Sequence, residues 1–208
     1  MAVPALVATV NKSIKIAAGE VSSGASSVNG SISVGENAVV SGNLKTVNGT
    51  IRVDDGATIE KASTVNGTVR IGENVKSESL GTVNGSIRVA RGSTVDGEIE
   101  AVNGRISLAN EASVADNVAN VNGDMDLSGA TVGGDVKTVN GDIELSEGSV
   151  VKGNLIVEEP SSWGWGKSSK SKPRVVIGPG SQVEVDLLLE REVELFISED
   201  ATVGGGKR

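Results

Sequence analysis

The sequence contains no cysteine and no histidine among its 208 residues. Without cysteine there can be no disulfide bond, no thiolate zinc site and no thiol nucleophile. Without histidine the chain lacks the commonest general base and the commonest metal ligand. These absences predict a protein that is not an enzyme and that holds no metal and no cofactor.

Aromatic residues are almost missing as well, with no tyrosine, one phenylalanine and two tryptophans. Valine, isoleucine, leucine and alanine must therefore fill the interior, which suits a narrow and repetitive core. The 28 glycines are spread along the chain, which disfavours helices and favours frequent turns. No run reaches the roughly 18 apolar residues that cross a membrane, so no transmembrane segment is expected.

Positive charge is in deficit, because 19 basic side chains face 27 acidic ones and leave a net charge of −8. An acidic protein repels polyanions over most of its surface. Nucleic acid is therefore not expected as a partner.

What the chain does have is a repeat. The triplet Val-Asn-Gly occurs at residues 28–30, 47–49, 65–67, 83–85, 102–104, 121–123 and 139–141. A degenerate first copy stands at residues 10–12, and successive asparagines are 18 or 19 residues apart. A fixed period of this length is the mark of a repeat architecture.

Each unit predicts three short strands. Between residues 47 and 64, Val47, Ile51, Val53 and Ile59 recur with period two in short bursts, and turn residues separate the bursts. The predicted fold is an all-β, single-stranded parallel β-helix, a β-solenoid of about ten coils. Equivalent residues then stack about 4.8 Å apart in parallel sheets. A right-handed winding is favoured over a left-handed one.

Stacking predicts columns of identical side chains. The triplet valines are expected to form one internal column, and a second internal column is expected from Ile32, Ile51, Val69, Ile87, Ile106, Met125 and Ile143. Thr46, Thr64, Thr82 and Thr138 are expected to form a partial outward column. Threonine columns occur in ice-binding solenoids, but threonine on an exposed strand more often reflects β-propensity alone.

The Asn-Gly pairs predict structural corners. Asparagine tolerates the left-handed region and glycine occupies it freely, so the pair can turn the chain. Stacked asparagine side chains can also hydrogen-bond along the column. We expect such a ladder at Asn29, Asn48, Asn66, Asn84, Asn103, Asn122 and Asn140.

The chain divides into a rod, a loop and a cap. Residues 1–8 read either as the remnant of a secretory signal peptide or as a short strand. Solenoid repeats are predicted for 9–157, a Trp- and Lys-rich loop for 158–174, final coils with a cap for 175–203, and a tail for 204–208. In the last coil, Phe196 is expected to close the core and the surrounding acids to discourage edge pairing.

The coils resemble those of bactofilins, a family of polymer-forming bacterial β-helix proteins, at residues 56–59, 95–99 and 150–155. The chain is still more similar to secreted gammaproteobacterial proteins with Val-Asn-Gly-Ser-Ile repeats, whose closing segment resembles residues 176–179 and 190–193. That group brings no assigned activity. The bactofilin resemblance implies right-handed winding and end-to-end polymerisation, although the basic loop and the charged last coil depart from that family.

Two enzymatic activities of other solenoids are relevant. Hexapeptide acyltransferases share the 18-residue period, but their catalytic histidine is missing here. Pectin-degrading β-helices bind calcium through acids in a groove, for which Asp124, Asp126 and Asp142 are the nearest match. Calcium needs six to eight converging oxygens, so these residues are better explained as solvated corner acids.

The loop is the sharpest functional candidate in the sequence. Its two aromatics and four cations suit a glycan or an anionic envelope surface, unless the tryptophans anchor the loop on a sheet. The candidate partner-binding residues are Trp163, Trp165, Lys167, Lys170, Lys172 and Arg174.

The expected function is that of a structural scaffold of the bacterial envelope that can self-associate. The alternative is a module that binds glycan or an anionic surface through the loop. A periplasmic or secreted location is expected, or a cytoplasmic one if the N-terminus is native.

Overall fold

The structure is a computed structural model that describes residues 6–160 and 172–204. Within these residues all regular structure is β, in three parallel sheets of ten strands each. The β-solenoid prediction is confirmed, and its right-handed winding stays a prediction. The described residues contain no helix that could span a bilayer.

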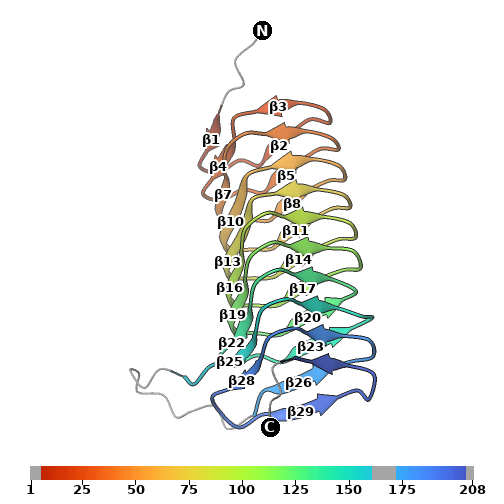
Figure 1. Cartoon of the computed structure of the whole chain (residues 1–208). Coiled ribbons are helices and arrows are strands. Elements are labelled where there is room, and N and C mark those ends of the chain that lie inside the picture. Colours follow the sequence, from red (N-terminus) through yellow and green to blue (C-terminus); the bar gives the residue numbers. More distant parts are fainter. Residues whose placement is uncertain (1–5, 161–171, 205–208) are drawn as a thin grey trace.

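Each coil contributes one strand to each sheet, so every third strand in the chain is a neighbour (Figure 1). Sheet A contains β1 (Val7–Thr9), β4 (Ala25–Ser27), β7 (Leu44–Asn48), β10 (Lys61–Asn66), β13 (Ser79–Asn84), β16 (Ile99–Asn103), β19 (Val118–Asn122), β22 (Val136–Thr138), β25 (Leu155–Val157) and β28 (Leu187–Leu189). Sheet B contains β2 (Ile14–Ile16), β5 (Ile32–Val34), β8 (Ile51–Val53), β11 (Val69–Ile71), β14 (Ile87–Val89), β17 (Ile106–Leu108), β20 (Met125–Ser128), β23 (Ile143–Ser146), β26 (Arg174–Ile177) and β29 (Glu194–Ile197). Sheet C contains β3 (Val21–Ser22), β6 (Val39–Val40), β9 (Thr58–Ile59), β12 (Lys76–Ser77), β15 (Thr94–Val95), β18 (Ser113–Val114), β21 (Thr131–Val132), β24 (Val150–Val151), β27 (Gln182–Val183) and β30 (Thr202–Val203).

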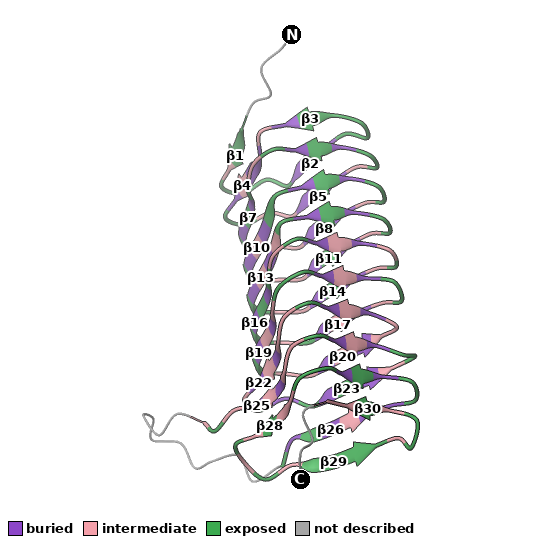
Figure 2. Ribbon diagram, in the orientation of Figure 1, coloured by how far each residue is buried: buried purple, intermediate pink, exposed green. Residues whose placement is uncertain are grey.

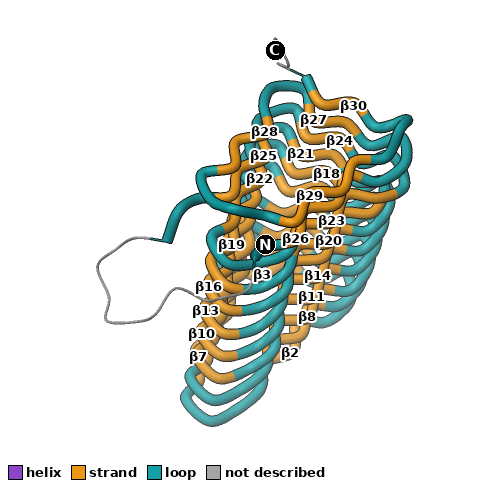
Figure 3. The backbone as a smooth tube through the Cα atoms, turned by 90° about the horizontal axis from the view of Figure 1, so that it is seen from below, coloured by secondary structure: helices purple, strands orange, loops and turns teal. Residues whose placement is uncertain are grey.

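The core is a stack of aliphatic side chains that runs the length of the rod. Figure 3 shows the coils superposed along the axis, with the strands of each sheet on one side. Inward residues of neighbouring strands are in direct register, as Ile51 is with Val69 and Val69 with Ile87. The predicted internal column that begins at Ile32 and ends at Ile143 is confirmed, because all seven of its side chains are fully buried.

The triplet valines were expected inside, and this prediction is wrong. Val47, Val65 and Val83 are 39–40% exposed, and the preceding threonines lie inside instead. The period of two explains the reversal. In β7, Leu44 is buried, so Thr46 two residues later also points inward and Val47 points outward.

The buried threonines satisfy polar backbone at the corner. Thr46 Oγ1 donates to the Gly30 carbonyl at 2.8 Å, and Thr64 Oγ1 donates to the Gly49 carbonyl at 3.0 Å. The Nδ2 group of Asn120 fills the same role with the Gly104 carbonyl at 2.6 Å. An inward column of hydroxyls therefore replaces the expected outward one, because the corner carbonyls need donors.

The glycine of the triplet is required by close stacking of the coils. A Cβ built on Gly85 would overlap the carbonyl oxygen of Gly67, and one on Gly67 would overlap that of Gly49. The triplet asparagines do not adopt the left-handed conformation expected for them. Among the described residues that are not glycine, positive φ occurs only at the corner after sheet B, at Asn37, Asn74, Glu111 and Glu147.

The predicted asparagine ladder is confirmed. Each Nδ2 group donates to the Oδ1 of the asparagine one coil earlier, from Asn29 on Asn11 at 2.9 Å to Asn140 on Asn122 at 2.9 Å. The intermediate bonds are 2.8–3.0 Å long. The ladder aligns the amide dipoles, and its acceptor end lies at Asn140.

We expect Gly85→Ala to lower the free energy of unfolding by about 2–3 kcal/mol, because the new methyl group has no space between coils. Gly81→Ala is the matched control in β13, the strand that ends just before Gly85, since a Cβ there meets only Ser63 Cβ at 3.9 Å. The control should be neutral or stabilising by up to about 1 kcal/mol. Urea denaturation followed by circular dichroism measures both, and equal effects would contradict the stacking explanation.

Exchanging threonine and valine, which have similar shapes, tests whether threonine faces inward and valine outward in the sheet A strands. Thr64→Val should cost about 1–3 kcal/mol, because it leaves the part-buried Gly49 carbonyl without its donor. Val65→Thr should change stability by less than about 0.5 kcal/mol, because that side chain faces solvent. The opposite ranking in thermal or urea unfolding would place valine inside and threonine outside.

Candidate functional site: an arginine row on sheet B

Outward positions of sheet B form a single column along the rod. In each three-residue strand the middle residue faces solvent, and the strands stack in register. From β2 to β29 the column reads Lys15, Ser33, Arg52, Arg70, Arg88, Ser107, Asp126, Glu144, Val176 and Phe196. Its basic half therefore precedes its acidic half.

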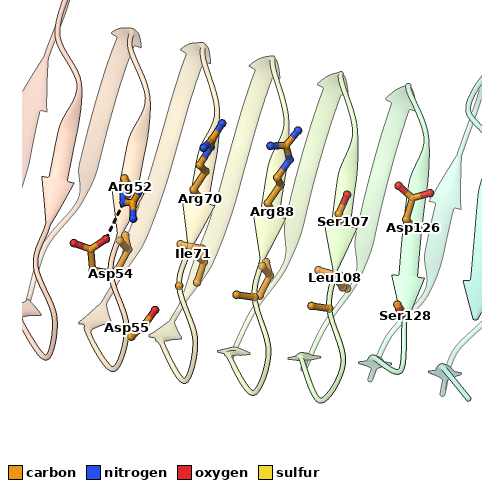
Figure 4. Close-up of a pocket in the computed structure, with 15 residues that line it drawn as sticks. Arg52, Asp54, Asp55, Arg70, Ile71, Arg88, Ser107, Leu108, Asp126 and Ser128 are labelled. Atoms are coloured by element: carbon orange, nitrogen blue, oxygen red, sulfur yellow. Dashed lines mark hydrogen bonds and ion pairs between the residues drawn. The ribbon is translucent and has the colours of Figure 1, made fainter. Parts of the chain in front are cut away.

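Three successive coils carry an arginine at this position (Figure 4). We call Arg52, Arg70 and Arg88 the arginine row. Arg52 Nε donates to Asp54 Oδ1 at 2.8 Å, and this bond raises the pKa of the Arg52 guanidinium. Within the described part of the chain, the guanidinium groups of Arg70 and Arg88 have no hydrogen-bond or ion-pair partner. Like charges on directly paired strands repel, so the row is an unfavourable arrangement in the free protein.

A shallow groove of about 530 Å³ runs beside the row. It exists because the first residue beyond each strand is small in three successive coils, at Gly72, Ala90 and Ala109. Ser107 and Asp126 line its other end, where they offer a hydroxyl and a carboxylate. The groove thus combines free guanidinium groups with hydrogen-bonding side chains on a rigid sheet.

The acids considered as calcium ligands all contact arginine residues, two through a guanidinium group and one through a backbone N–H. Arg105 Nη2 donates to Asp124 Oδ2 at 2.7 Å, and Nη1 lies 3.1 Å from Asp126 Oδ2. The bond to Asp124 is the main cause of a raised pKa of Arg105. Asp142 Oδ1 accepts a bond from the Arg174 backbone N–H at 2.8 Å. In residues 6–160 and 172–204 no cluster of three or more acidic side chains is arranged to hold a metal ion.

Only the base of the predicted binding loop is described. Trp163, Trp165, Lys167 and Lys170 lie outside the described residues. Lys172 Nζ lies 2.9 Å from Glu192 Oε2, and this contact lowers the pKa of Glu192. The Arg174 guanidinium sits 5.0 Å from the centre of the Phe196 ring. These two basic residues are therefore engaged with the last coil of their own chain.

The loop leaves the rod at the asparagine corner, between β25 and β26, where the ladder stops. Arg191, in the next coil, reaches across this gap to the ladder. Its Nη1 donates to Asn140 Oδ1 at 2.8 Å and to the Val139 carbonyl at 3.0 Å. A cation thus caps the acceptor end of the aligned amides, where negative partial charge accumulates.

The C-terminal end of the rod is open, contrary to the expected cap. Phe196 pairs in register with outward Val176 and is 50% exposed, so it does not close the core. The core positions of the same strand, Leu195 and Ile197, are 39% and 46% exposed, because β29 is the last strand of sheet B in the described residues (Figure 2). At the other end, Ile14 and Ile16 occupy the same two columns and are 5% and 2% exposed.

Sheet A carries a second groove of about 540 Å³, lined by the exposed triplet valines and by small residues such as Ser63 and Gly81. Its wall is the valine stripe at Val28, Val47, Val65, Val83 and Val102.

Comparison with known proteins brings no match: neither a family model, nor a curated protein, nor a solved structure is similar to the chain. The bactofilin-like identity therefore stays a prediction, and function must be argued from the geometry.

The arginine row was missed in the sequence although a signal was present. Each of its members follows a triplet asparagine by four residues, at Asn48, Asn66 and Asn84. Three arginines at one phase of a stacked repeat must lie side by side. The sequence suggested the loop as the binding site instead, because the composition of the loop is locally unusual.

Arg191→Met should release the end of the ladder and destabilise the last coils by about 1–2 kcal/mol, through two lost charge-assisted bonds. Amide hydrogen exchange should accelerate in β28 and β29 while the first coils keep their protection. Arg91→Met is the control, because it removes a fully exposed ion pair with Glu111 that solvent screens. Uniform acceleration along the rod would contradict a local capping role.

Proposed function

We propose that the chain is a non-enzymatic structural rod of the bacterial envelope that associates with a second copy through its C-terminal end. The observation that carries this proposal is the open last coil. Leu195 and Ile197 continue the core columns and are left without a covering layer. In the described part of the chain β28, β29 and β30 each end a sheet, as β1, β2 and β3 do at the other edge, so their outer backbone groups have no further strand to pair with.

Two further observations support a structural role. The chain is built almost entirely from one stacked unit, and the sequence has neither histidine nor cysteine for catalysis. Placement in the envelope rests on the resemblance to secreted Val-Asn-Gly-repeat proteins.

The unequal ends favour a closed dimer over a filament. A head-to-tail polymer needs two complementary open ends, and the two ends differ in sheet B: Ile14 and Ile16 are covered at the N-terminal end, where Val7 of sheet A is the exposed core position at 40%. Two C-terminal ends can instead meet about a two-fold axis and cover each other's exposed core. Glu190, Glu192 and Glu194 lie in this last coil, so two copies repel each other and the association is weak at low ionic strength.

Size-exclusion chromatography with light scattering tests this proposal. The protein should show a dimer mass at high concentration, and added salt should increase the dimer fraction because it screens the acids. Leu195→Asp combined with Ile197→Asp should leave only monomer. The variant should remain folded, because the substituted side chains are already about half exposed. Circular dichroism checks this.

Val65→Asp combined with Val83→Asp is the matched control, because it places the same two charges at similarly exposed apolar sites on the side of the rod. Loss of the dimer in this control would assign association to the valine stripe. A monomer at every concentration, or a mass that grows without limit, would overturn the closed dimer.

A further inference from the structure

Electrostatic repulsion within the arginine row is unfavourable, and the solenoid fold does not require arginine at these positions. Arg70 is in direct register with Arg52 on one side and with Arg88 on the other. Neighbouring strands in a sheet are about 4.8 Å apart, so the three side chains share one narrow strip of surface. Elsewhere in this column neutral serines occupy the equivalent position, at Ser33 and Ser107. Stacking therefore does not demand arginine, and a ligand with matched charge would offset the repulsion.

We propose that the groove beside the arginine row binds a linear acidic polysaccharide, with its carboxylates on Arg70 and Arg88 and its axis along the rod. Guanidinium groups bind carboxylates through paired hydrogen bonds, and both arginines are free to do so in the described structure. Their regular spacing, one coil apart, suits a polymer whose charge recurs once in each sugar unit. A single small anion would need only one of the two side chains.

The rest of the groove suits sugar hydroxyls. Ser107 and Asp126 follow the row in the same outward column and line the same groove. Asp126 is near Arg105 and not near the row, so its carboxylate is held in place at the far end. Gly72 and Ala90 leave space beside the arginines for a chain of sugar rings.

The same features argue against nucleic acid. No aromatic residue lines the groove, so unpaired bases would have no stacking partner. The protein has a net charge of −8, and the acidic half of the column, Asp126 and Glu144, follows within two coils of Ser107. A long polyphosphate would run from the row onto these acids. A short stretch of weakly charged polymer, anchored at the row, fits better.

Isothermal titration with hexagalacturonate as the probe tests the site. The unmodified protein should bind this acidic oligosaccharide, and it should bind neutral maltohexaose at least about tenfold more weakly. Arg70→Gln combined with Arg88→Gln should reduce the affinity about tenfold or more, because both charge-assisted contacts are lost. Both arginines are exposed and unpaired, so the variant should keep its unfolding midpoint.

Two control variants separate a built site from general charge. Lys45→Gln combined with Lys76→Gln removes the same charge from sheets A and C and should leave binding unchanged. Ala90→Leu keeps every charge but fills the groove, and it should weaken binding severalfold. Equal losses in the lysine and arginine variants would overturn the proposal.

Other ligands give distinct outcomes. Equal affinity for inorganic sulfate and for hexagalacturonate would show an isolated anion site and not a polysaccharide groove. Tighter binding of a single-stranded DNA oligonucleotide would assign the row to nucleic acid. If the arginine variant changes the mass of the free protein in light scattering, the row is a contact between two copies. Each of these results, like the absence of binding to hexagalacturonate, would overturn the proposal. None of them bears on the C-terminal dimer, which is tested separately at Leu195 and Ile197.

Discussion

Self-stacking is the constraint on which the rest of this structure depends. Each residue lies about 4.8 Å from its equivalents in the coils above and below, so a side chain is acceptable only if it tolerates a copy of itself. Aliphatic residues meet this condition inside, and asparagines meet it at the corner by donating to one neighbour and accepting from the other. Glycine meets it where the backbones approach too closely for a Cβ. The repeat in the sequence follows from this condition.

Arginine does not tolerate a copy of itself in the neighbouring coil. The arginine row on sheet B therefore indicates a role beyond the fold. Three guanidinium groups at one phase of the repeat raise the free energy of the isolated protein, whereas serine at the same position does not. Arg105 shows how the fold handles a cation when a partner is at hand, with two carboxylates within 3.1 Å. A cation left without such a partner on a rigid face marks a surface open to an outside anion.

The ends of the rod obey a different condition, because self-stacking stops there. Arg191 replaces the missing rung of the ladder with a cation, and Arg174 covers the ring of Phe196. Neither covers the last core layer, at Leu195 and Ile197. Termination of a solenoid needs a layer that tolerates no copy above it, and the described residues supply such a layer for the polar ladder but not for the apolar core.

The architecture could be predicted from the sequence: the coil length, the three sheets, the buried column from Ile32 to Ile143 and the asparagine ladder. A period of 18 or 19 residues held over eight copies leaves few other ways to satisfy backbone hydrogen bonds. Which residues of each strand face inward became clear from the three-dimensional structure. Threonine and valine have similar shapes, so the sequence did not show that Thr46 donates inward while Val47 faces solvent. It also took the stack of coils to bring Arg52, Arg70 and Arg88 together, because residues 18 apart in the chain become neighbours only when one coil lies on the next.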